Sequence, residues 1–150
     1  MKRWLKYTLC ACIMVLLQIS GMTYAGQVQE VPMLTGVRQT AMNQIEITYD
    51  KKADMTKATT PSNYWVQSTQ EVNPTGIATL GKDQKIGSEN ALTADKVMIK
   101  AADRSGKKFA LTFKENIKPG SEYKIIICYV TVPGGAPYTG DNGSAVFTGK

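Results

Sequence analysis

The stretch from Asn116 to Tyr123, followed by Lys124-Ile125-Ile126-Ile127, constrains the fold of this chain more than any other. Pro119-Gly120 forms a tight turn, and a strand of alternating character follows it. In antiparallel β-sandwiches a tyrosine at the start of the penultimate strand places its ring in the core, while its hydroxyl bonds to backbone a few residues upstream. We therefore expect Tyr123 to be buried, with Ile125 and Ile127 on the same inward face.

Alternation of polar and apolar residues marks the other strands. Gln44–Asp50 alternates without interruption, which places Ile45, Ile47 and Tyr49 on one face. Phe109–Phe113 repeats the pattern, and a polar turn at 103–106 joins it to Val97–Ala101 as an antiparallel hairpin. Four further strands are expected at Met33–Arg38, Tyr64–Gln67, Tyr123–Val130 and Ala145–Thr148. With no amphipathic helix, the pattern predicts an all-β antiparallel sandwich of about seven strands, like immunoglobulin or fibronectin domains.

Two connections are long. Thr69–Asp95 contains one short apolar run, Ile77–Leu80, where we expect a short additional strand. The glycine-rich segment 133–143 reads as an exposed loop between the last two strands.

The N-terminus has the layout of a secretory signal peptide. Lys2, Arg3 and Lys6 precede an apolar run at 9–17, and Thr23-Tyr24-Ala25 supplies small residues at a cleavage site. The apolar run is shorter than the roughly 20 residues of a membrane-spanning helix. We expect residues 1–25 to be removed, residues 26–150 to form a single domain, and the protein to be secreted or held in the cell envelope, extracellular or periplasmic.

Removal of the leader changes the charge and the cysteine content. It leaves 15 basic residues against 12 acidic, a formal charge of +3, and Cys128 as the one remaining cysteine, so no intrachain disulfide is expected. The basic residues are scattered lysines, whereas nucleic-acid binders cluster Lys and Arg on one face. We expect no nucleic-acid partner.

The order and spacing of several short motifs resemble those of a known family. The motifs are Ile45–Asp54, Ser62–Val66, Lys107–Phe113, Ile117–Tyr123 and Val146–Gly149. Together they resemble the bacterial Ig-like domains found in surface-layer and other exported cell-surface proteins. The resemblance implies a spacer or recognition module and no enzyme; such domains usually occur as repeats, whereas this chain carries one copy.

Few residues offer catalytic or metal chemistry. The chain has no histidine, which removes the usual general base and Ser-His or Cys-His nucleophile systems. Asp50 and Asp54 could form a hydrolytic pair, but ordinary turn acids explain them better. Asp141-Asn142-Gly143 could bind calcium together with these acids, although its spacing matches no calcium loop and Asn-Gly favours a turn. Copper ligation by Met33, Met42, Met55 and Met98 lacks histidine partners, and core packing accounts better for most of them. No cofactor is expected.

Strand parity predicts an interaction surface. If Tyr64 and Val66 face the core, Trp65 faces outward, and the same reasoning turns Ile126, Cys128 and Val146 outward on strands of the same sheet. Such an apolar patch marks an interface with a protein, an envelope polymer or a second copy. Alternatively, the segment Thr69–Asp95 or the arm Gly26–Pro32 covers it. Cys128 would then be a buried thiol rather than one that pairs between chains.

The sequence therefore predicts a non-catalytic binding module with the Trp65 face as its candidate site. A carbohydrate or surface-polymer recognition domain, with Trp65 and Tyr138 stacking on sugar rings, is the alternative. A hydrolase built on the acids is a third hypothesis.

Overall fold

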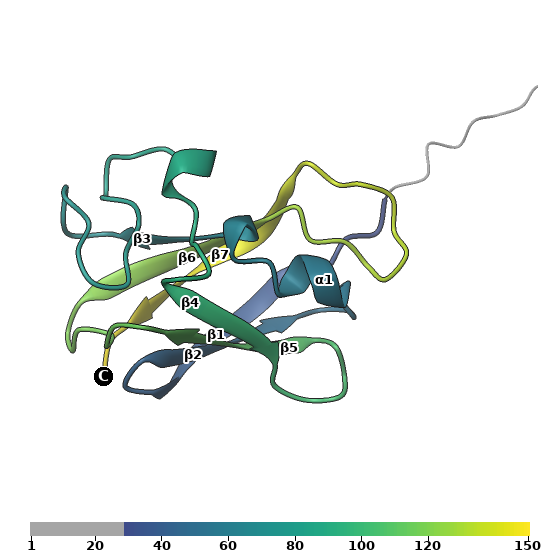
Figure 1. Cartoon of the computed structure of the whole chain (residues 1–150), viewed down its shortest axis with the longest axis horizontal. Helices are drawn as coiled ribbons and strands as arrows, with labels where there is room; N and C mark the ends of the chain where they lie inside the picture. The colour runs from purple at the N-terminus through teal and green to yellow at the C-terminus, as the bar shows by residue number, and fades with distance from the viewer. Residues whose placement is uncertain (1–28) are drawn as a thin grey trace, which may run out of the picture.

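A computed structural model of the chain describes residues 29–150. The signal peptide at 1–25 and the start of the mature chain at Gly26 lie outside these residues and stay predictions. Two antiparallel sheets face one another (Figure 1), and seven strands form them. The strands are β1 Leu34–Ala41, β2 Gln44–Tyr49, β3 Tyr64–Ser68, β4 Val97–Ala101, β5 Lys108–Phe113, β6 Glu122–Cys128 and β7 Asp141–Thr148. The predicted all-β sandwich is confirmed.

One sheet has the strand order β1-β2-β5-β4 and the other β3-β6-β7. This is the ABED and CFG arrangement of constant-type immunoglobulin domains. The predicted hairpin is present, because β4 and β5 pair antiparallel with Val97 opposite Phe113. Within residues 29–150, helical structure is limited to three short pieces, α1 Met55–Ala58, η1 Pro61–Asn63 and η2 Ser88–Asn90. None of the helices in residues 29–150 is long and apolar enough to cross a membrane.

The core between the sheets is built from the inward positions of each strand. Ile45, Ile47 and Tyr49 of β2 are buried against alternate residues of β5 and of the opposite sheet. Tyr123 is buried as predicted, and its ring stacks on Phe147 with the centroids 5.5 Å apart. Within the described residues, however, its hydroxyl makes no hydrogen bond to upstream backbone. The stacked rings and the backbone hydrogen bonds of Gly120 and Ser121 with Gly149 hold this corner.

Three expectations about connections were wrong. Residues 77–80 form no strand but a single parallel bridge, Gln67 to Leu80. At this bridge Ser68 N donates to Leu80 O at 2.8 Å and Leu80 N donates to Val66 O at 3.1 Å. β7 begins at Asp141, so Asn142-Gly143 belongs to a strand and not to a turn; a bulge opposite Ile127 and Cys128 accommodates it. The strand predicted to Val130 ends at Cys128, because Tyr129 has a φ of 68°.

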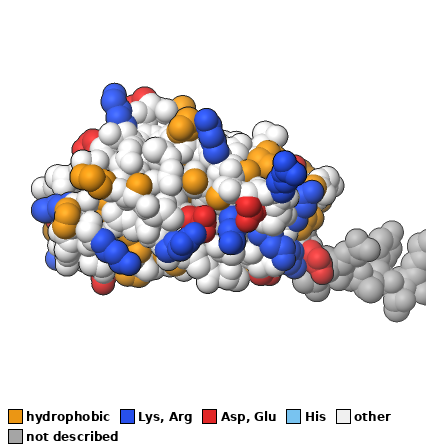
Figure 2. Space-filling model, turned by 90° about the horizontal axis from the view of Figure 1, so that it is seen from below, with side chains coloured by type: hydrophobic (Ala, Val, Ile, Leu, Met, Phe, Trp, Pro, Cys, Tyr) orange, Lys and Arg blue, Asp and Glu red, His pale blue; other side chains and the backbone are white. Residues whose placement is uncertain are grey.

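The outer face of the β1-β2-β5-β4 sheet is polar. Viewed from below this sheet, Lys and Arg side chains lie among Asp and Glu, with apolar groups scattered singly (Figure 2). Arg38 and Glu46, opposite each other on β1 and β2, form an ion pair of 2.9 Å. This face has the character of an ordinary solvated surface.

Candidate functional site

The outer face of the β3-β6-β7 sheet carries the predicted patch. Trp65 lies opposite Ile126 in the β3-β6 ladder, and Val146 lies opposite Lys124 in the β6-β7 ladder. Trp65 and Cys128 belong to a small apolar cluster that is separate from the core between the sheets. The predicted direction of these side chains is therefore correct.

Their predicted exposure is only partly correct. Trp65 is 2% exposed and Cys128 4%, whereas Val146 is 52% exposed and Ile126 is half-buried. Trp65 and Cys128 cannot contact a partner in this fold. The surface that remains is Val146 with the exposed side of Ile126, at the β7 side of the sheet.

The chain's own segment 69–95 covers the face, which is the alternative that strand parity left open. Leu80 and Ala91 pack against the indole of Trp65, and the indole N–H donates to the carbonyl of Gly87 at 2.9 Å. The segment also closes the free edge of β3: Thr79 N donates to Val66 O at 2.8 Å, and Leu92 N donates to Tyr64 O at 2.8 Å. These bonds satisfy an edge that would otherwise invite pairing with other chains.

The described part of the N-terminal arm, residues 29–32, does not provide the cover. The carbonyl of Pro32 accepts a hydrogen bond from the side chain of Asn142, and Gln29 donates to the carbonyl of Ala136. In the described residues, this arm therefore follows the start of β7 and the loop before it.

Cys128 has the properties of a buried structural thiol. Burial raises its pKa, and the nearby negative charge of Asp141 raises it further. Because the thiolate is the reactive form, both effects disfavour disulfide exchange at this position.

Tyr129 is an exposed aromatic residue beside the buried indole. Its ring lies 6.1 Å from that of Trp65 in an edge-to-face arrangement, and 39% of the residue is exposed. Its φ of 68° is in the left-handed region that favours glycine. No residue pattern in the sequence predicts this conformation.

The left-handed backbone at Tyr129 predicts how two substitutions there will differ in stability. Tyr129→Gly and Tyr129→Ala both lose the aromatic contact, but only glycine relieves the left-handed strain, so the glycine variant should be more stable by about 1 kcal/mol. Urea unfolding of the two variants measures the difference. An alanine variant as stable as the glycine variant would contradict the assigned backbone.

The candidate acids serve backbone groups. Asp54 caps α1 by accepting from Lys57 N at 2.9 Å, Asp50 accepts from Met33 N at 2.8 Å, and Asp141 accepts from Gly143 N. Among residues 29–150, no three Asp, Glu or Cys side chains are grouped as a metal site would require. These acids therefore have structural roles, and calcium binding stays an untested hypothesis.

The methionines are exposed, so the expectation that most of them pack in the core was wrong. Met33, Met42, Met55 and Met98 are 40%, 71%, 49% and 51% exposed. Met98 lies between the inward residues Val97 and Ile99, and Met42 lies in the turn after β1. Strand parity explains the exposure of Met98, whereas Met33, Met42 and Met55 lie outside the strands.

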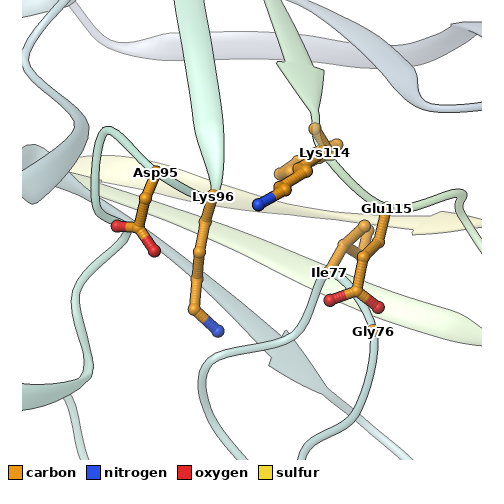
Figure 3. A pocket seen from close by; sticks show the side chains of 7 residues that line it. Gly76, Ile77, Asp95, Lys96, Lys114 and Glu115 are labelled. Atoms are coloured by element: carbon orange, nitrogen blue, oxygen red, sulfur yellow. The ribbon is translucent and has the colours of Figure 1, made fainter.

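A pocket of about 370 Å³ opens where β4 begins and β5 ends (Figure 3). Ile77 and Phe113 line it, and around them lie the charged side chains of Asp95, Lys96, Lys114 and Glu115. A hydrogen bond from Thr93 lowers the pKa of Asp95, and the charges of Lys96 and Lys114 lower it further. A lowered pKa makes this carboxylate a weak general base, and the pocket presents two lysines and two carboxylates.

The chain is therefore an Ig-like β-sandwich by fold. Its candidate catalytic acids, Asp50, Asp54 and Asp141, accept hydrogen bonds from its own backbone. Solved structures of similar fold include several of the bacterial S-layer protein SbsC. A structure of residues 31–844 of SbsC has a TM-score of 0.53 at 16% identity, covering 79% of this chain and 14% of that one. The N-terminal part of SbsC has a TM-score of 0.52 at 16% identity, covering 79% of this chain and 23% of that one. SbsC domains 1–6 have a TM-score of 0.51 at 16% identity, covering 79% and 14%.

At this identity the similarity shows the fold alone. The chain spans only 14% to 23% of the length of these S-layer chains. No protein-family model matches the chain, and no curated protein matches its sequence.

Proposed function

We propose that the protein is an exported, non-catalytic module of the cell envelope or extracellular space, akin to the bacterial Ig-like domains of surface-layer proteins. The supporting observation is its Ig-like sandwich, a fold it shares with parts of the S-layer protein SbsC. The structural use of Asp50, Asp54 and Asp141 favours this over a hydrolase.

The binding surface of this module is proposed to be the outer face of β7 and β6 that the segment 69–95 leaves open. Val146, opposite Lys124 in the β6-β7 ladder, is its most exposed apolar residue, and the half-buried Ile126 lies further along the same ladder, opposite Ser144. The partner is a protein, an envelope polymer or a second copy of the chain.

Two variants with equal exposure test this surface. Val146 on one sheet is 52% exposed and Met98 on the other is 51% exposed. Val146→Lys is expected to weaken binding of the mature chain to envelope fragments of its host at least about tenfold, or about 1.4 kcal/mol. Met98→Lys should leave binding unchanged.

Analytical ultracentrifugation of both variants tests whether the partner is a second copy of the chain. If the parent protein and Met98→Lys sediment as dimers and Val146→Lys as a monomer, the partner is a second copy. Equal binding by both variants would show that this face is not the binding surface. Absence of an epitope-tagged chain from the envelope and medium fractions would refute the cell-surface proposal as a whole.

Carbohydrate recognition is the second candidate, supported by the exposed ring of Tyr129 next to the loop 130–140. Stacking on Trp65 is excluded by its burial. Soluble glycans should change the fluorescence of Trp65 through its contact with Tyr129, and Tyr129→Ala should abolish the change.

A further inference from the structure

The two ends of the described chain leave the sandwich at opposite ends. Residue 29 lies at one end and the C-terminus at the other (Figure 1). β1 and β7 lie side by side and run in the same direction. Near their starts a Cβ at Gly143 would be 3.3 Å from Leu34 Cβ, and past the end of β7 Lys150 N donates to Gln39 Oε1 at 2.8 Å.

A force that pulls the two ends of the domain apart therefore acts along the direction of β1 and β7. β1 is held by its antiparallel ladder with β2, and β7 by its ladder with β6. A pull that acts along a strand loads all the hydrogen bonds of its ladder together, whereas a pull across it would break them one at a time. Unfolding from the two ends therefore requires strands to slide past each other.

The point where the chain enters β1 is clamped to the opposite sheet. Asn142 of β7 is fully buried, and its amide nitrogen donates to Pro32 O at 2.8 Å and to Val130 O at 2.7 Å. Its side-chain oxygen accepts from Val130 N at 2.8 Å. Because Pro32 precedes β1, this amide joins the start of β1 to β7.

The start of β1 is also held to β2, within its own sheet, by two hydrogen bonds between residues 33 and 50. Met33 N donates to the Asp50 carboxylate at 2.8 Å, and Asp50 N donates to Met33 O at 2.9 Å. The other end of the load path is also fixed, because Gly149 N donates to Ser121 O and Gly120 N to Gly149 O, both at 2.9 Å.

We infer that the domain is a load-bearing link that resists stretching between its two ends, and that Asn142 is the clamp through which a load on the N-terminal end reaches the β7 sheet. The biological setting rests on the proposed function, because a load presupposes attachment at both ends. Resistance to stretching is a property of the isolated domain and can be measured whether or not the proposed function is correct.

The test compares variants of equal equilibrium stability under force. The mature chain is held by identical handle domains at both ends and stretched at constant force. Asn142→Ala is expected to unfold about tenfold faster than a control matched by urea unfolding, a barrier difference of about 1.4 kcal/mol. The control is Ile99→Val or Ile99→Ala in β4, an edge strand that leads to neither end of the chain.

If Asn142→Ala does not fold, Asp50→Ala is the second test variant. The Asp50 substitution removes an exposed side chain and only one of the two hydrogen bonds between residues 33 and 50. It should also unfold faster under load than its matched control. If neither variant unfolds faster than a control of equal stability, the clamp is refuted. A failure here leaves the cell-surface proposal standing, because cell fractionation tests that proposal independently.

Discussion

Replacing Trp65 by alanine is expected to lower the free energy of unfolding by about 3–5 kcal/mol, the usual cost of removing a large buried aromatic side chain. The indole is 2% exposed and fills the space between β3 and the segment 69–95. The variant also leaves the carbonyl of Gly87 without its donor. Urea unfolding of the variant and the parent protein measures the loss.

Val146→Ala is the matched control on the same face. It removes an exposed apolar side chain and should change stability by less than about 0.5 kcal/mol. Trp65 is the only tryptophan of residues 29–150, so its fluorescence should be blue-shifted in the folded protein and shift to the red in urea. A Trp65→Ala loss below about 1 kcal/mol would show that the segment does not cover the indole.

The sequence predicted the parts of the fold that follow from local alternation. Ile45 and Ile47 are inward because a strand has a period of two residues, and the same rule correctly turned Trp65 away from the core between the sheets. Grouping Trp65, Ile126 and Val146 on one sheet followed from the strand order of the sandwich.

Parity could not show what covers a face. The segment 69–95 has no period, and its position depends on isolated contacts such as Gln67 with the carbonyl of Gly81 at 3.0 Å and Trp65 with that of Gly87. The acceptors in these contacts are backbone carbonyls of the segment, which no side-chain pattern in the sequence indicates. Strand parity therefore predicted the direction of Trp65 but left open whether this segment covers it.

Asn142 illustrates the same limit. Asn-Gly is a frequent turn dipeptide, and the alternation that predicted the last strand began only at Ala145. Its partners, Pro32 and Val130, are distant in sequence, and the bulge in the β6-β7 ladder is a property of the assembled sheet. A local signal cannot distinguish such a buried amide from an exposed turn residue.

A pair of buried tyrosines should make the protein sensitive to alkaline pH. Tyr49 of β2 and Tyr64 of β3 connect the two sheets through hydroxyl groups 3.0 Å apart, and the Tyr64 hydroxyl donates to Ala58 O at 2.6 Å. Burial raises the pKa of both phenols, and for Tyr49 the proximity of Tyr64 raises it further. Folding therefore holds both groups protonated.

The direction of the effect follows from the difference in proton binding. In the unfolded chain the phenols ionise near pH 10, whereas the folded protein retains their protons to higher pH. Stability should be unaffected below about pH 10 and should then fall as pH rises, by about 1.4 kcal/mol per pH unit for each tyrosine. Urea unfolding at intervals between pH 8 and pH 11 measures this slope, with the pH range set by that reference pKa.

Variants assign the slope to these two groups. Tyr49→Phe should remove about half of the excess slope, because one phenol no longer titrates, and Tyr49→Phe combined with Tyr64→Phe should remove the rest. Ile99→Val controls for reduced stability, since it changes no titrating group and should keep the parent slope. If the double variant loses stability above pH 10 as steeply as the parent protein, the two hydroxyls are not the buried link between the sheets.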